Sequence, residues 1–185
     1  MTQGLAARVE ALLLGDAERR RLLSIVASLD LPDGWIGAGF VRDAVWDMLH
    51  GAAPQPITGD IDVIWFDRDS APGRDSRIEQ ALAELAPGYR WEATNQAHVH
   101  AANGDPPYAD ATDAMRFWPE TATAIAARMT GPERCEIAAP LGLRDLFDLA
   151  LRPTPGFSLR KRHIFESRIA RKRWLERYPL LHVEA

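Results

Sequence analysis

The segment Asp60-Ile61-Asp62-Val63-Ile64-Trp65-Phe66 constrains the fold of this chain more than any other part of the sequence. β-Branched and aromatic side chains dominate it, which is typical of a buried β-strand. Its first half alternates acidic and apolar residues, and side chains two positions apart on a strand project from the same face. We therefore expect the carboxylates of Asp60 and Asp62 to converge, while Ile61 and Val63 point to the other face.

This acidic pair is unusual because two neighbouring carboxylates on an apolar strand repel each other and lose hydration. A divalent cation would offset that cost. The plain structural alternative is a strand that begins in solvent with an ordinary acidic turn. That alternative explains Asp60 easily but Asp62, which lies between two apolar residues, less easily.

A second informative feature lies upstream, where Trp35–Ala38 is predicted as a short buried strand and a helix follows at once. Apolar residues recur at helical spacing up to Leu49, and Gly51 supplies the stop. Gly39 allows the backbone to approach a ligand closely, and the unpaired N–H groups of a helix start bind phosphate. Alone this signal is weak, because the glycine order is not that of a P-loop or a dinucleotide-binding fingerprint.

Alternating helical and strand patterns predict an α/β (α+β) fold, with a small mixed β-sheet flanked by helices. The 185 residues, 46% hydrophobic and 26% charged, suit a single domain and exclude a disordered chain. We expect a helical cover over residues 1–30, a core over 31–151 and a basic terminal helix over 157–178. Within the core, Ser76–Ala86 is predicted as a helix and Tyr89–Asn95 as a strand.

The pattern is less regular in the second half of the chain. The strand ending at Asn95 can continue through Val99 or Ala101. Residues 109–129 are predicted as two short helices divided at Pro119, because proline breaks a regular helix. Residues 135–139 are predicted as a last strand, and residues 143–151 as a helix.

The sequence contains no stretch of the roughly 18 apolar residues that a membrane helix requires. Its start has the pattern of an amphipathic helix without a signal-peptide cleavage site. The single cysteine, Cys135, cannot form an internal disulfide or a cysteine-based zinc site. These features predict a cytoplasmic protein with no membrane partner.

The end of the chain is strongly basic, although the whole chain has a net charge of −4. Residues 152–177 hold nine Lys or Arg against two acidic residues. Such a segment can contact nucleic-acid phosphates, or it can be a solvated helix packed on an acidic body. A helical wheel places Ile164, Phe165, Ile169 and Leu175 on one side, with Arg168 and Lys172 near it. We therefore expect the helix to dock on the body.

Together these motifs resemble the polymerase-β-like nucleotidyltransferase superfamily. Its signature is a small-residue pair that opens a helix, then an acidic-hydrophobic-acidic strand, with a third carboxylate on a later strand. Ala38-Gly39-Phe40-Val41-Arg42-Asp43 and Gly59-Asp60-Ile61-Asp62-Val63 are similar to tRNA CCA-adding enzymes, which have a glycine where this chain has Ala38. Over nearly its whole length the chain resembles bacterial nucleotidyltransferase-like proteins of unassigned substrate, through motifs such as Trp118-Pro119-Glu120-Thr121-Ala122-Thr123-Ala124 and Arg152-Pro153-Thr154-Pro155.

The resemblance implies a Mg²⁺-dependent enzyme that moves a nucleoside monophosphate from an NTP to an acceptor hydroxyl and releases pyrophosphate. Asp60 and Asp62 would bind the metal, and Ala38, Gly39 and the helix start would hold the triphosphate. The acceptor stays open between RNA, protein and a small molecule. The alternatives are a non-catalytic nucleotide- or RNA-binding module and a toxin–antitoxin partner with the same fold.

The third carboxylate is expected to be Glu92, which could bind the same metal and act as a base toward the acceptor hydroxyl. Glu136, on the last predicted strand, is the competing candidate.

Three further residues are nucleotide-binding candidates. Arg42 could clamp a phosphate in a bidentate manner, or form an ion pair with Asp43 or Asp47. Asn95 and Gln96 carry amides suited to base or ribose recognition, and a structural turn is the alternative for both.

Overall fold

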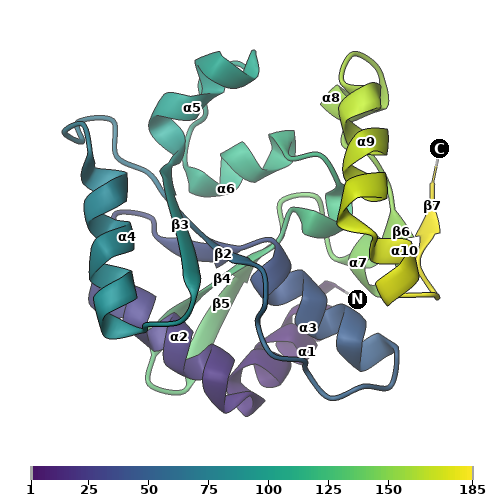
Figure 1. Ribbon diagram of the computed structural model, residues 1–185, viewed down its shortest axis with the longest axis horizontal. Helices are drawn as coiled ribbons and strands as arrows, with labels where there is room; N and C mark the ends of the chain where they lie inside the picture. The colour runs from purple at the N-terminus through teal and green to yellow at the C-terminus, as the bar shows by residue number, and fades with distance from the viewer. Residues whose placement is uncertain (1, 185) are drawn as a thin grey trace.

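The computed structural model describes residues 2–184 and is built around a five-stranded sheet (Figure 1). In chain order the strands are β1 (Trp35–Gly37), β2 (Asp60–Trp65), β3 (Arg90–Asn95), β4 (Ala126–Gly131) and β5 (Arg134–Ala138). They are arranged in the order β3-β2-β1-β4-β5, and only β2 and β3 run parallel to each other. The predicted small mixed sheet flanked by helices is therefore confirmed.

Four longer helices cover one face of this sheet. They are α1 (Thr2–Gly15), α2 (Ala17–Ser28), α3 (Gly39–Leu49) and α4 (Arg74–Leu85). Asp16 caps α2, because its side chain accepts hydrogen bonds from the N–H groups of Glu18 and Arg19. None of the helices within residues 2–184 combines the length and apolarity that a membrane span requires.

Short helices lie on the opposite side of the sheet (Figure 1). These are α5 (Gln96–Asn103), α6 (Ala111–Ala114) and η1 (Met115–Phe117). Two further short helices, η2 (Thr121–Thr123) and α7 (Arg144–Phe147), pack against α3 and each other, and Ala122 and Leu146 belong to the main core. A small apolar cluster around Trp35, Ile64 and Met115 covers part of that face. The rest of it is where the polar residues of β2 emerge.

The alternation of β2 divides its side chains between the two faces. Ile61, Val63 and Trp65 are fully buried in the main core beneath the four long helices. Asp60 and Asp62 therefore share the face of Ile64, which the short helices only partly cover.

The turn into α3 is tight and partly strained. Ala38, the N-cap residue, has φ +51°, a region that residues other than glycine rarely occupy. Its N–H donates to the carbonyl of Ile125 (2.9 Å), and its carbonyl accepts from the N–H of Arg42 (2.9 Å). The flanking contacts thus hold Ala38 in a conformation that glycine would adopt without cost.

The basic terminal segment docks as expected, but it is not one helix over 157–178. It consists of α8 (Pro155–Ser158), α9 (Arg162–Lys172) and α10 (Trp174–Arg177). Arg173 breaks the run because it adopts a left-handed conformation (φ +52°) at the end of α9. Phe165 and Ile169 are buried as the helical wheel predicts, whereas Ile164 and Leu175 are exposed.

Three other predictions about secondary structure are wrong. The strand before residue 95 does not continue, because the Asn95 side chain caps α5 instead. Residues 126–129 belong to β4 and not to a helix, since buried sheet contacts override the helical preference of alanine and methionine. The helix expected over 143–151 ends at Phe147. It is followed by β6 (Ala150–Leu151), which pairs in parallel with β7 (His182–Val183).

The C-terminal segment is anchored on α3 by aromatic contacts. The rings of Trp174 and Tyr178 meet the Trp46 ring edge-on, with centroid separations of 5.8 and 5.2 Å. The Tyr178 hydroxyl donates to Oδ1 of Asp47 (3.0 Å), a carboxylate that is almost fully buried.

We predict that Trp174→Ala lowers the free energy of unfolding by about 3 kcal/mol, because it removes a large buried side chain and leaves a cavity. Urea denaturation measures the change. Leu175→Ala is the matched control, since its exposed side chain should contribute less than about 0.5 kcal/mol. Equal effects of the two substitutions would contradict the docking role of Trp174.

Candidate active site

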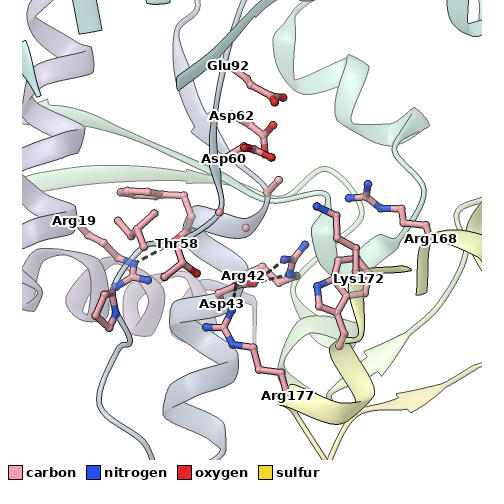
Figure 2. Close-up of a pocket in the computed structure, with 17 residues that line it drawn as sticks. Arg19, Arg42, Asp43, Thr58, Asp60, Asp62, Glu92, Arg168, Lys172 and Arg177 are labelled. Atoms are coloured by element: carbon pink, nitrogen blue, oxygen red, sulfur yellow. Dashed lines mark hydrogen bonds and ion pairs between the residues drawn. The ribbon is translucent and has the colours of Figure 1, made fainter. Parts of the chain in front are cut away.

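An open cavity of about 310 Å³ lies between the start of α3, the loop before β2, the first residues of β2 and β3, and the C-terminal helices (Figure 2). Four carboxylates line it: Asp43, which pairs with Arg42 and Arg177, and the strand residues Asp60, Asp62 and Glu92. Five cationic side chains line it as well: Arg19, Arg42, Arg168, Lys172 and Arg177. Acidic and basic groups from distant parts of the chain therefore meet in one cavity.

The parallel pairing of β2 and β3 brings the carboxylates together. Asp62 lies opposite Glu92 in the register of the two strands, and Asp60 lies opposite Arg90. Burial, followed by the negative charge of Glu92, raises the pKa of Asp62 to about 6. Without a bound metal ion, the site therefore disfavours the ionised form of Asp62 beside Glu92.

Asp60 has a partner of its own on the neighbouring strand. Its Oδ1 lies 3.0 Å from Nε of Arg90, whose side chain is largely exposed. Such an exposed pair contributes little stability and is easily exchanged for another partner.

The donor set fits a hard divalent cation such as Mg²⁺, because all three candidate ligands are carboxylates. Within residues 2–184, no three acidic, His or Cys side chains are gathered tightly enough to form a preassembled metal site. A metal at Asp62 would compete with Arg90 for the carboxylate of Asp60. The electrostatic cost at Asp62 is one that a bound cation would remove.

Ala38 and Gly39 line the same cavity at the start of α3. The first N–H groups of a helix have no partner within the helix, and they favour an anion. The predicted phosphate-binding turn and the predicted metal ligands are therefore brought together.

Arg42 is buried and makes the structural contacts that were one of its two predicted roles. It donates to Oδ1 of Asp43 (3.0 and 2.6 Å) and to Oγ1 of Thr123 (3.1 Å). Its guanidinium lies over the rings of Trp46 (4.8 Å) and Trp174 (4.5 Å). It still lines the cavity, so its charge acts there from a fixed position.

Glu92 and Glu136 lie far apart in the sheet. Glu136 is on the edge strand β5, where its Oε2 is 2.7 Å from Nη2 of Arg128. The residues that line the cavity include Glu92 and not Glu136.

The two amide side chains predicted to bind a base or ribose, Asn95 and Gln96, lie in different places. Asn95 is buried outside the cavity, where its side chain accepts from the N–H groups of Asp67 and Ala97 (both 3.1 Å) and donates to the Asp67 carbonyl (2.7 Å). Its hydrogen bonds make it a helix cap, the turn role that was the alternative. Gln96 instead lines a second cavity.

The second cavity, of about 220 Å³, adjoins the first at the carboxylates. Both are lined by Ala38, Asp62, Glu92 and Arg168. The remaining walls of the second cavity are neutral: Ile64, Thr94, Gln96, Trp118, Pro119 and Thr123. One cavity is thus rich in cations and the other is mostly uncharged, with Asp62 and Glu92 between them.

Four cations of the cavity were not among the predicted site residues: Arg19, Arg168, Lys172 and Arg177. The helical wheel does place Arg168 and Lys172 beside the apolar side of the docking helix, which indicates that both lie near its interface with the body. Arg19 gave no such signal. Its Nε donates to the carbonyl of Phe40 (3.1 Å) across a long sequence separation.

A family model described as "Nucleotidyltransferase" matches residues 24–183. The chain belongs to this family, and it is a nucleotidyltransferase. Among solved structures it is similar to one whose NMR structure is described as revealing a CCA-adding enzyme head domain. That similarity has 31% identity and a TM-score of 0.84, and it covers 95% of this chain and 94% of that one. No curated protein matches the chain.

Two larger solved proteins share the fold. A CCA-adding enzyme in complex with CTP is 18% identical with a TM-score of 0.60, over 96% of this chain and 43% of that one. The apo form of a tRNA-processing enzyme is 18% identical with a TM-score of 0.53, over 89% and 42% of the two chains. This chain therefore spans less than half the length of either protein.

We predict that Asp62→Asn stabilises the metal-free protein by about 1–3 kcal/mol at pH 8. An unfolded Asp ionises near pH 4, whereas Asp62 keeps its proton to about pH 6. Between these values folding takes up a proton, so wild-type stability falls as pH rises through this window. The variant lacks that loss.

Urea denaturation with a chelator at pH 4, 6 and 8 measures the difference. The gap between variant and wild type should be near zero at pH 4 and level above about pH 7. A variant that is less stable than wild type at pH 8 would instead give Asp62 a structural role.

Proposed function

We propose that this protein uses Mg²⁺ to transfer a nucleoside monophosphate from an NTP to an acceptor hydroxyl, with release of pyrophosphate. The observation that carries the proposal is the junction of the two cavities. There, acidic residues of adjacent parallel strands face a helix start and a cationic wall. Membership of the nucleotidyltransferase family supports the same reaction class.

Asp60 and Asp62 are the proposed metal ligands, and Glu92 is the proposed third carboxylate. When bound, Mg²⁺ would neutralise charge on the phosphates during transfer. Glu92 lies beside Asp62 and borders both cavities, so it is suited to accept the proton of an acceptor hydroxyl that enters from the second cavity.

The triphosphate is proposed to lie in the first cavity. The helix start at Ala38 and Gly39 offers N–H groups there, and Arg42 supplies a fixed positive charge. The acceptor then enters from the second cavity, so that the attacking and leaving oxygens lie on opposite sides of the reacting phosphorus.

RNA is the acceptor that we propose to test first. The similar structures are described as a CCA-adding enzyme head domain and as CCA-adding or tRNA-processing enzymes. Helix α9 adds an exposed basic surface next to the site. Its Arg171 is exposed and forms no ion pair with any other residue in the range 2–184.

A non-catalytic nucleotide-binding module is the second candidate. Two observations favour it: Asp60 is paired with Arg90, and Ala38 holds a strained conformation where glycine would be relaxed. The two candidates differ in turnover, since both bind a nucleotide but only one releases pyrophosphate. A toxin–antitoxin partner protein with this fold would show no response to NTP.

We predict that Asp60→Asn, Asp62→Asn and Glu92→Gln each reduce NTP turnover by at least about 100-fold without unfolding the protein, because each removes a proposed metal ligand. Radiolabelled NTPs incubated with total RNA, protein lysate and small-molecule pools report the transfer. Glu136→Gln is the matched control and should leave turnover unchanged, since Glu136 lies at the other edge of the sheet.

Wild-type protein that is stabilised by Mg²⁺ and a non-hydrolysable NTP, yet transfers nothing in any pool, would favour the non-catalytic module. Wild-type protein without any NTP-dependent stabilisation would contradict both candidates.

If RNA is the acceptor, Arg171→Glu should weaken RNA binding and flatten its dependence on salt by roughly one unit of log–log slope or more. Arg173 is a poorer choice for this test, because it pairs with Glu176 and ends α9. NTP affinity should stay unchanged. Unaltered RNA binding and salt slope would assign the basic segment to packing and favour a protein or small-molecule acceptor.

A further inference from the structure

Glu120 is a fully buried carboxylate next to the two cavities. Its backbone pairs with Pro153, and its Oε1 lies 2.9 Å from Nε of Arg168 on α9. Within residues 2–184, neither of its oxygens accepts a well-aligned hydrogen bond. The ion pair with Arg168 is therefore what compensates this buried charge.

Such a pair is a poor means of attaching a helix. The cost of removing two charges from water commonly equals or exceeds their attraction, and apolar residues of similar volume stabilise as well or better. Helix α9 already has apolar anchors in Phe165 and Ile169. The pair is better explained by what it does to the direction of the Arg168 side chain.

The Arg168 side chain is fixed by contacts at Nε and at the Trp174 ring, while part of its guanidinium is open to the cavities. Its Nε faces Glu120, and its guanidinium lies 5.4 Å from the centre of the Trp174 ring. About a quarter of the side chain stays exposed, and it lines both cavities. Figure 2 shows the guanidinium directed into the cavity on the side of Asp62 and Glu92.

Lys172 follows one helical turn later on the same face of α9 and lines only the first cavity. Figure 2 shows its ammonium directed into that cavity. A guanidinium offers two parallel donors to a phosphate, whereas an ammonium acts as a point charge. The two side chains together make a cationic wall suited to a chain of phosphates.

We propose that Arg168, positioned by the buried Glu120, binds the polyphosphate of the substrate at the junction of the cavities, with Lys172 binding its outer part. Arg168 contacts the ligand, and Glu120 is a positioning residue that acts through it. The inference rests on the proposed function for the identity of the nucleotide, but it concerns a phosphate site that an inorganic polyphosphate also fills.

The experiment measures binding of two probes in the presence of Mg²⁺: a non-hydrolysable NTP and inorganic tripolyphosphate. Arg168→Gln should weaken both by about 10- to 100-fold, because it removes charged hydrogen bonds to phosphate. Glu120→Ala should weaken both by about 10-fold, and Glu120→Gln, which keeps an acceptor oxygen, should restore most of that loss. Arg162→Gln, on the same helix but lining neither cavity, is the control and should bind both probes as wild type does.

A double variant separates stability from binding. Glu120→Met/Arg168→Met replaces the ion pair by an apolar pair of similar volume, so its thermal stability should equal or exceed that of wild type. Its affinity for both probes should nevertheless fall as it does in Arg168→Gln. A double variant that is less stable but binds both probes normally would make the pair a structural clamp and overturn the inference.

The two probes also distinguish this inference from the proposed function. If wild type binds tripolyphosphate through Arg168 but does not bind the NTP, the phosphate site stands and nucleotidyl transfer fails. If wild type binds both probes and neither Arg168 nor Glu120 affects them, the inference fails alone. If wild type binds neither probe, both fail.

Discussion

The structure depends on one unfavourable arrangement, the side-by-side placement of Asp62 and Glu92 that parallel pairing of β2 and β3 imposes. The backbones of these two residues cannot separate without a shift in strand register, which would carry Ile61 and Val63 out of the core. Packing of the apolar side chains of β2 therefore stabilises a register that concentrates negative charge on the open face of the sheet. Burial and like charge together raise the pKa of Asp62 to about 6, and the surrounding cations lie where they oppose that charge.

Three of those cations, Arg168, Lys172 and Arg177, reach the site because the end of the chain folds back onto α3. Trp174 and Tyr178 pack on Trp46, and Tyr178 donates to the buried Asp47. Helix α3 therefore begins at the proposed phosphate-binding turn and also holds the C-terminal segment in place. A C-terminal segment attached elsewhere would leave the cavity without Arg168, Lys172 and Arg177, with Arg19 and Arg42 as its remaining cations. The same contacts therefore stabilise the fold and set the charge of the site.

The parts of the site that could be predicted from the sequence are those set by local rules. Strand alternation determines that Asp60 and Asp62 share a face, and hydrophobic spacing determines where α3 begins and ends. The neighbours of the acidic pair depend on long-range pairing, which no local pattern encodes: Glu92 and Glu136 are both acidic residues on short strands, and only the strand order separates them. The place of Asn95 was hidden for a similar reason, since its amide donates to the Asp67 carbonyl, a contact that forms only when β2 and β3 pair. The break at Arg173 also lacks a signal, because arginine rarely adopts a left-handed conformation.

Because acidic and basic groups share one cavity, the binding of a metal and the binding of a polyphosphate should affect each other. Before a metal binds, the cations of the cavity face carboxylates, and Asp60 is paired with Arg90. A divalent cation at Asp60 and Asp62 would neutralise the acidic side, which would leave Arg168, Lys172 and the start of α3 to attract an anion without competition. A polyphosphate would in turn neutralise the basic side and make the carboxylates a better metal site. Because such coupling is reciprocal, the metal and the phosphate chain should each raise the affinity for the other by the same factor. The strand register that forces the carboxylates together is thus also what would make this site respond to a metal–nucleotide complex more strongly than to either component.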